Sequence, residues 1–322
     1  MLGMLRKALC LILLLAFSSV SATKKEPYCE WDEEISSRFI KKADKRLLTE
    51  NRKGAREIVR ESLPFELSTL NFESDNEQLL VQPNYIIWYD SDLRSPLWVA
   101  YHLKGSDLRD GVPREESFRS DPRLKYWEKS DCADYKEPIF DQGHMVPSAD
   151  MKRSREAMAS TYLMSNMTAQ HCHFNRGQWQ VLEAVVRNWA ERYGEIWVIS
   201  GAIYDRYGEG ERDPDQIAWR MSGERGVRVA IPSHQYKIVM RKDETGLLGV
   251  AFLMPNEDRV VRTEDMREYL GNASVDIEAV VSRSGFDFGK GIKIREDGEE
   301  WLLPINLPSS LAGLCKEGYS KY

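Results

Sequence analysis

The chain has 322 residues, of which 42% are hydrophobic and 30% are charged, and its formal net charge at pH 7 is −6. A chain of this length and composition can bury a sizeable hydrophobic core. Its acidic balance argues against broad, non-specific adhesion to polyanions, although binding of a polyanion needs only a local basic surface.

The first 22 residues have the pattern of a secretory signal peptide. Arg6 and Lys7 precede an apolar run over residues 8 to 17, and small residues at 20 to 22 suit cleavage. Because a helix needs ~20 apolar residues to cross a bilayer, an uncleaved membrane anchor is the weaker alternative. Cleavage removes two positive charges and takes the net charge from −6 to −8. We therefore expect a secreted or periplasmic protein with no membrane segment in its mature form.

Four cysteines remain after the predicted cleavage, since Cys10 leaves with the signal peptide. They are Cys29, Cys132, Cys172 and Cys315. An even set in an oxidising compartment favours two disulfides. Among the three possible pairings we favour a bridge between Cys29 and Cys315, which ties the termini, and a second between Cys132 and Cys172. One bridge with two buried thiols is the alternative.

Residues 23 to 78 are expected to form a helical N-terminal extension followed by a linker. Apolar side chains recur at every fourth position from Ile35 to Leu47 among charged residues, which is typical of a helix that packs along one face. A similar stripe continues after Gly54, and the polar residues 71 to 78 have the composition of a linker.

Residues 79 to 322 are expected to form one domain that begins with strands. Short runs rich in β-branched and aromatic residues predict strands, and apolar residues at helical spacing predict helices. The expected strands cover residues 85–89, 97–103, 196–203, 227–231, 236–241 and 248–254, with 232–234 as a hairpin connection, and the expected helices cover 178–193, 263–270 and 275–284. Clustered strands interrupted by few helices favour the α+β class, with a mixed, mainly antiparallel sheet, over a doubly wound parallel sheet.

Three polar residues between positions 144 and 183 carry the chemistry of metal-assisted hydrolysis. His144 offers an imidazole whose ordinary pKa, near 6.5, leaves it largely neutral at neutral pH and able to accept a proton from water. Asn175 offers a carboxamide oxygen, which suits Mg²⁺ and equally Mn²⁺. Asn175, Trp179 and Glu183 are spaced by four and share one side of the predicted helix, so Glu183 can reach the water shell of a metal on Asn175. Such a set is sufficient for phosphodiester hydrolysis.

The order of these motifs resembles that of the DNA/RNA non-specific endonucleases of the ββα-metal (His-Me finger) group, which includes endonuclease G-like enzymes. The resemblance covers roughly residues 82 to 290. It rests on Asp-Gln-Gly-His at 141–144, Ser-Asn at 165–166 and Asn-x-x-x-Trp-x-x-x-Glu over 175–183. It implies a ββα-metal nuclease core within the α+β fold and a metal-dependent, sugar-non-specific endonuclease that cleaves DNA, RNA or both.

The resemblance also implies a role for each matching residue. His144 takes the position of the general base, Asn175 that of the direct protein ligand of Mg²⁺, and Glu183 that of the carboxylate holding metal-bound water. Asn166 matches the asparagine upstream of the metal ligand, and Asp141 opens the signature.

Arginines before and after the signature are candidates for contacts with substrate phosphates. The family's arginine upstream of the signature corresponds to either Arg119 or Arg114, and Arg176 is a further candidate. Gln142 replaces the arginine of the family signature Asp-Arg-Gly-His, so a permanently charged, bidentate phosphate contact is exchanged for a neutral one. This departure supports a second hypothesis, a catalytically weak or inactive member that binds nucleic acid or protein through the same cleft.

His171-Cys172-His173 suggests a third hypothesis, a zinc site. In a strand the two histidines and the cysteine between them point to opposite faces, so the three are poor joint ligands. We therefore expect Cys172 to form a disulfide and the protein to use Mg²⁺ or Mn²⁺.

Overall fold

The computed structural model describes residues 40–45, 53–65, 76–135, 140–204, 218–221, 227–288, 294–296 and 315. The expected signal peptide, the start of the N-terminal extension and most of the expected linker lie outside the described residues.

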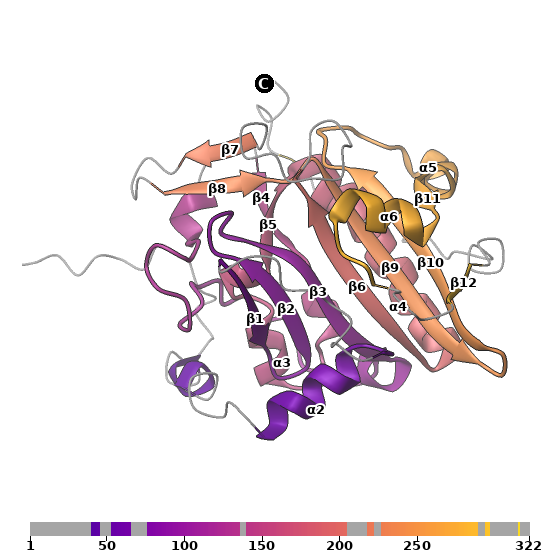
Figure 1. The fold of residues 1–322 in the computed structure, drawn as a ribbon, viewed down its shortest axis with the longest axis horizontal. Coiled ribbons are helices and arrows are strands. Elements are labelled where there is room, and N and C mark those ends of the chain that lie inside the picture. Colours follow the sequence, from indigo (N-terminus) through magenta and orange to yellow (C-terminus); the bar gives the residue numbers. More distant parts are fainter. Residues whose placement is uncertain are drawn as a thin grey trace, which may run out of the picture.

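A large, mainly antiparallel sheet organises the described part of the chain (Figure 1). Its eight strands follow the order β1-β2-β3-β6-β9-β10-β11, with β12 paired in parallel to β10. The strands are β1 Glu77–Val81, β2 Tyr85–Asp90, β3 Ser95–Lys104, β6 Glu195–Ile203, β9 His234–Asp243, β10 Gly246–Pro255, β11 Ser274–Val275 and β12 Ile294–Glu296. The α+β class and the mixed, mainly antiparallel sheet are therefore confirmed.

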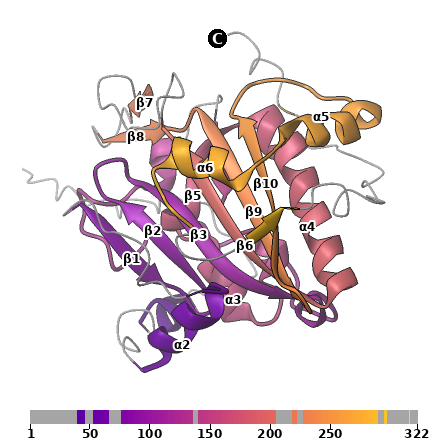
Figure 2. The same ribbon diagram turned by 45° about the vertical axis from the view of Figure 1, so that its right-hand side comes forward.

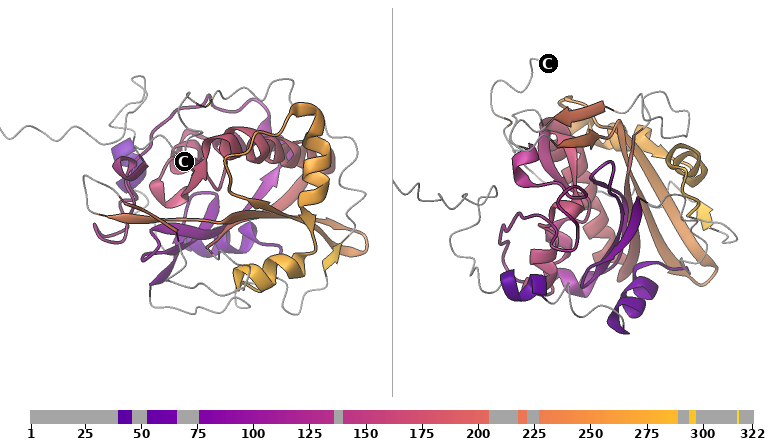
Figure 3. Two further views of the ribbon diagram at one scale, coloured as in Figure 1. Left: turned by 90° about the horizontal axis from the view of Figure 1, so that it is seen from above. Right: turned by 60° about the vertical axis from the view of Figure 1, so that its left-hand side comes forward.

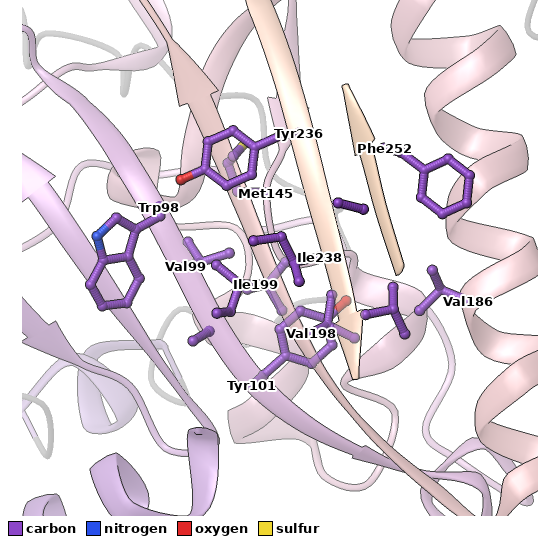
Figure 4. Packing of buried hydrophobic residues seen from close by; sticks show 14 of the residues in the cluster. Trp98, Val99, Tyr101, Met145, Val186, Val198, Ile199, Tyr236, Ile238 and Phe252 are labelled. Atoms are coloured by element: carbon purple, nitrogen blue, oxygen red, sulfur yellow. The ribbon is translucent and has the colours of Figure 1, made fainter. Parts of the chain in front are cut away.

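The central strands are apolar along most of their length because both faces of the sheet are covered. All six residues of β2 are buried, as are eight of the nine residues of β6. A strand buried on both faces has a continuous apolar run instead of a clean alternation. In Figure 4, Val198, Ile199 and Ile238 lie between aromatic side chains of β3 on one side and Phe252 with Val186 on the other.

Helices cover the two faces of this sheet. The α-helices in the described part of the chain include α2 Lys53–Ser62, α3 Arg155–Ser160, α4 Gln180–Tyr193, α5 Met266–Ala273 and α6 Ile277–Ser284. Seen from above, α4 and α6 lie on opposite sides of the sheet (Figure 3, left). Figure 2 likewise shows α6 in front of the strands and α4 behind them. The helix α2 packs on β2 and β3, so the part of the N-terminal extension that the structure describes includes a helix docked on the sheet.

A separate hairpin precedes α4 and completes a ββα unit. Strand β4, Phe140–His144, pairs antiparallel with β5, Met167–His171, and a π-helical turn, Phe174–Trp179, leads directly into α4. The hairpin is fixed to the large sheet because Gln170 Nε2 donates to Gln235 Oε1 at 2.7 Å. Gly143 permits this close packing, since a Cβ there would lie 2.1 Å from Cδ of Gln170.

Two connections differ from the sequence predictions. Residues 232–234 do not close a hairpin, because β8 Arg228–Ile231 pairs with β7 Ala218–Met221 in a separate two-stranded sheet. The hairpin instead joins β9 to β10, and Gly246, with φ 129°, adopts the backbone conformation that this tight turn requires.

The predicted disulfide pairing is also wrong. Cys172 is bonded to Cys315, with a Cα–Cα distance of 5.9 Å, and Cys132 belongs to another disulfide. Cys172 directly follows β5 and starts the turn into the helix, so the bridge ties the C-terminal segment to the ββα unit. The sequence could not distinguish the pairings because cysteine number sets only how many bridges form, not which ones.

Candidate active site

A cleft of about 550 Å³ lies where the β4–β5 hairpin meets the π-helical turn and α4. Its lining is rich in charged and polar side chains. It includes seven of the residues singled out in the sequence: Arg114, Asp141, Gln142, His144, Asn175, Arg176 and Glu183. The fold therefore brings together, in one cleft, residues that are up to 69 positions apart in the chain.

His144 ends strand β4 and presents its ring to the cleft between two aromatic side chains. The ring centroids of Phe118 and Tyr162 lie 5.6 and 5.1 Å away, both in edge-to-face orientation. Burial, reinforced by the nearby charge of Arg114, lowers the pKa of His144 to about 3. Nε2 is buried and has no hydrogen-bond partner within the described part of the chain. The imidazole is thus neutral at physiological pH, with a nitrogen that no described group occupies.

Asn175 lies in the π-helical turn and is oriented by a carboxylate. Its Nδ2 donates to Oδ2 of Asp141 at 2.9 Å. Because a carboxylate only accepts hydrogen bonds, the amide nitrogen must face Asp141, and the amide oxygen remains for another partner. Trp179, fully buried one turn later, donates from Nε1 to the backbone oxygen of His144 at 3.3 Å. The helix start and the end of β4 are thereby held together.

The donor set of the cleft suits a hard divalent cation. Asn175 offers an amide oxygen and Glu183 a carboxylate, and both are oxygen donors of the kind that Mg²⁺ prefers. In the described residues there is no group of three or more His, Cys, Asp and Glu side chains arranged to hold a metal. Mg²⁺ usually keeps several waters and needs few protein ligands, so these residues fit it. A zinc site at Cys172 does not fit, because that sulfur is in a disulfide.

Glu183 lies in the first turn of α4 among other charges. Burial raises the pKa of its carboxyl group, while the positive charges of Lys237 and Arg187 oppose that rise. Lys237, on β9, is fully buried, with Nζ 4.2 Å from the centre of the Trp179 ring and a 2.8 Å hydrogen bond to Ser200 Oγ. The buried cation of Lys237 opposes the effect of burial but does not cancel it, and the pKa of Glu183 is raised to about 7.

Arg187 is a cleft residue that the sequence analysis missed. It lies one turn beyond Glu183 on α4 and lines the cleft. Its Nη1 donates to Oδ1 of Asp150 at 3.0 Å, and the hydroxyl of Tyr101 donates to the other oxygen of Asp150 at 2.7 Å. The signal was present in the sequence, because the four-residue spacing that links positions 175, 179 and 183 extends to 187.

Arg114 lies in the cleft beside the general-base candidate. Its Nη2 contacts Glu116 at 2.7 Å, and Nη1 donates to Ser148 Oγ at 3.2 Å. The guanidinium carbon lies 5.6 Å from the centre of the Tyr162 ring, which also contacts the ring of His144. Of the two upstream arginines considered from the sequence, Arg114 is the one that the fold brings to His144.

Arg119, the other upstream candidate, does not line the cleft. Its side chain is 8% exposed, and its guanidinium donates to both carboxylate oxygens of Asp44. A further bond goes to the backbone oxygen of Ala159 at 2.8 Å. Arg119 thus binds the segment 40–45 to the domain, and its contacts are structural.

Asn166 also lies outside the cleft lining. Its Oδ1 accepts from the backbone nitrogen of Val146, and its Nδ2 donates to the backbone oxygens of Val146 and Thr161. These three bonds fix the backbone immediately after His144. In contrast, Gln142 does line the cleft, from the middle of β4.

Comparison with known proteins identifies relatives of this chain. Residues 64–293 match the sequence model of a family described as DNA/RNA non-specific endonuclease. The mitochondrial nuclease EXOG of Danio rerio is 32% identical over 54% of this chain, which spans about half (51%) of that relative. Human mitochondrial endonuclease G is 29% identical over 68% of this chain and 71% of its own length. Nuclease C1 of Cunninghamella echinulata var. echinulata is 31% identical over 65% of this chain and 81% of its own.

One solved structure supports the fold. A chain in the crystal structure of a complex between EndoG and EndoGI, described as showing the mechanism of EndoG inhibition, superimposes with a TM-score of 0.57. The match covers 74% of this chain and 92% of that one, at 24% sequence identity. The ββα-metal architecture expected from the sequence is therefore shown.

The comparisons contradict the predicted location. The relatives from Danio rerio and Homo sapiens are named as mitochondrial proteins, which overturns the expectation of a secreted or periplasmic protein. The prediction rested on residues 1 to 22, where Arg6 and Lys7 supply positive charge. Such charge is common to secretory signals and mitochondrial targeting segments. Within the described residues, no helix combines the length and the apolar character that a membrane crossing needs.

Proposed function

Because the chain belongs to the DNA/RNA non-specific endonuclease family, we propose that it hydrolyses internal phosphodiester bonds of DNA, RNA or both with the help of a divalent cation. The observation that carries this proposal is the neutral imidazole of His144, whose buried Nε2 lacks a described partner, in the same cleft as Asn175 and Glu183. A surface that only binds nucleic acid has no need of a base, an oriented amide oxygen and a carboxylate in one place.

His144 acts in this proposal as the general base. It accepts a proton from a water molecule that attacks phosphorus, and the backbone bond from Trp179 together with the flanking rings of Phe118 and Tyr162 holds the imidazole in place. General-base catalysis by a positioned side chain contributes about 10²–10⁴-fold in rate. The low pKa of His144 weakens it as a base but keeps it unprotonated throughout the neutral range.

In this proposal Asn175 binds the cation directly, and Glu183 orients the water molecules around it. The amide oxygen of Asn175 would hold Mg²⁺ or Mn²⁺, which would supply positive charge against the negative charge that develops on the phosphoryl oxygens. Asp141 fixes the direction of that amide oxygen by accepting from Nδ2. The carboxylate of Glu183 orients water molecules next to Asn175.

Arginines of the cleft position the substrate. Arg114 lies beside His144 with 57% of its side chain exposed, and Arg187 lies beyond Glu183 with 23% exposed. Arg114 is paired with Glu116 and Arg187 with Asp150, and each ion pair restricts the orientation of the guanidinium group. Such groups suit the contacts with phosphates on either side of the cleaved bond.

The test is cleavage of plasmid DNA and of a structured RNA by the purified protein in Mg²⁺, in Mn²⁺ and in EDTA. The proposal expects cleavage with either ion and none in EDTA. Cleavage that resists the chelator would contradict the metal dependence. Binding of either polymer without any cleavage would favour the second candidate, a non-catalytic binding module, which the neutral Gln142 in the cleft supports.

A further inference from the structure

A neutral side chain and a cation line the same cleft where the hairpin meets the helix. Gln142, on β4, lines the cleft without a charge, and Arg176, in the π-helical turn, lines the same cleft with 39% of its side chain exposed. Asp141, the strand residue directly before Gln142, connects the two elements. It accepts from Nε of Arg176 at 2.7 Å and from Nη2 at 2.8 Å, one bond to each carboxylate oxygen.

Asp141 also ties this cation to the candidate metal ligand. The same carboxylate accepts from Nδ2 of Asn175 at 2.9 Å and is only 11% exposed. The carboxylate of Asp141 thus fixes the orientation of two consecutive side chains, those of Asn175 and Arg176. A guanidinium held along one edge by a carboxylate has a fixed plane, so less side-chain entropy is lost when it binds a second anion.

We propose that Arg176 supplies, from the helix, the phosphate-binding cation that position 142 lacks on the strand. This inference rests on the proposed nuclease function and assigns the phosphate contact next to Asn175. A guanidinium gives phosphate a permanent charge and paired N–H donors, whereas the carboxamide of Gln142 gives neutral hydrogen bonds. The family signature has an arginine at the position where this chain has Gln142. In this chain the π-helical turn supplies the cation in place of β4, so the cleft keeps a positive charge.

The test compares four variants of the full chain: Arg176→Gln, Gln142→Arg, the double variant Gln142→Arg/Arg176→Gln, and Arg155→Gln. Arg155 is a matched control, because it is 42% exposed, contacts a carboxylate of Glu115 through Nε and Nη2, and does not line the cleft. The first readout is kcat/KM for DNA cleavage in Mg²⁺. The second is the affinity for a DNA oligonucleotide in EDTA, measured over a range of salt concentrations.

Arg176→Gln is expected to lower kcat/KM by about tenfold or more, because a charge-assisted phosphate contact is lost. It is also expected to reduce the slope of log affinity against log salt concentration by roughly one. The double variant is expected to recover most of both losses, and Arg155→Gln to behave as the wild type. Both variants that lack Arg176 lose its ion pair with Asp141, so recovery in the double variant does not come from restoring that pair.

Either of two results would overturn the inference. One is an Arg176→Gln variant with wild-type kcat/KM and salt slope. The other is a folded double variant no better than Arg176→Gln in both readouts. If the wild type itself does not cleave, the proposed nuclease function fails, and the salt slopes still decide whether Arg176 contacts phosphate.

Discussion

At the scale of single residues, His144 combines a shielded ring with a nitrogen that has no described partner. The rings of Phe118 and Tyr162 pack against the imidazole, and burial of the ring disfavours its charged form. The charge of Arg114 acts in the same direction. The imidazole of His144 therefore stays neutral from the neutral range down to mildly acidic pH, and it can accept a proton from water over that whole range.

The pH dependence of His144 follows from its pKa of about 3, compared with the ordinary 6.5. The folded protein binds fewer protons than the unfolded chain between these values, so protonation of His144 favours unfolding, and stability falls as pH drops from 6.5 toward 3. We expect the NMR chemical shift of the His144 ring in the metal-free protein to stay constant from pH 8 to pH 5. A titration midpoint between pH 6 and 7 would contradict the shielding.

Arg114 and Arg119 are expected to respond differently to replacement. Arg114→Ala should lower kcat/KM with little change in Tm, because its side chain is exposed in the cleft. Arg119→Ala should destabilise the fold by about 3 kcal/mol, because it leaves Asp44 without its buried partner, while activity well below Tm is kept. Thermal unfolding and cleavage assays on both variants measure the two effects. The reverse pattern would return the phosphate contact to Arg119.

Residue identities in the site were largely predictable, whereas their surroundings were not. The types and spacing of His144, Asn175 and Glu183 indicated a base, a metal ligand and a carboxylate, and the fold places all three in one cleft. The choice between Arg114 and Arg119 depends on a contact with Asp44, which is 75 residues away in the sequence. No local pattern carries such information.

At the scale of elements, the ββα unit depends on a π-helical turn that the sequence did not reveal. The expected helix begins at residue 178, whereas residues Phe174–Trp179 form this wider turn before the regular α-helix begins at Gln180. Such insertions occur often at functional sites. The strands β4 and β5 were also not predicted, because each has only five residues and the strand β4 carries polar signature residues in place of an alternating pattern.

Gly143 lies where β4 packs closely on Gln170 of β5, so a larger side chain at this position is expected to destabilise the fold. Gly143→Ala would bring a Cβ within 2.1 Å of Gln170, whose side chain is buried and fixed by Gln235. We expect a loss of about 1 to 3 kcal/mol in unfolding free energy, as for other overpacked sites. The matched control is Gly177→Ala, where nothing lies within 4 Å of the added atom and no loss is expected. Equal Tm values for the two variants would refute the packing argument.

At the scale of the whole molecule, one large sheet supports the ββα unit, to which it is joined by the hydrogen bond between Gln170 and Gln235. Five of the eight strands of this sheet, β2, β3, β6, β9 and β10, were predicted from their apolar and β-branched runs, since burial on both faces leaves a strong local signal. The other three, β1, β11 and β12, were not. The order of the strands and the partner of Cys172 were not predictable either, because both are set by contacts between distant residues. The bridge joins Cys172 to Cys315, which are 143 residues apart in the sequence.

Loss of this bridge is expected to destabilise the whole fold. Replacement of Cys315 by serine frees the C-terminal segment and should lower the unfolding free energy by about 2 to 5 kcal/mol, since a long loop is no longer closed in the unfolded chain. Denaturant unfolding of the variant and of the oxidised wild type measures the difference. An unchanged denaturation midpoint would show that the disulfide between Cys172 and Cys315 does not stabilise the fold.

The most direct test of the central claim is the conversion of covalently closed plasmid circles to nicked circles in Mg²⁺ by the wild type and by His144→Ala. Closed circles have no ends, so nicking reports internal cleavage alone. The account predicts nicking by the wild type and a loss of about 10²–10⁴-fold in rate for a variant that remains folded. Nicking by His144→Ala at the wild-type rate would contradict the assignment of His144 as the general base.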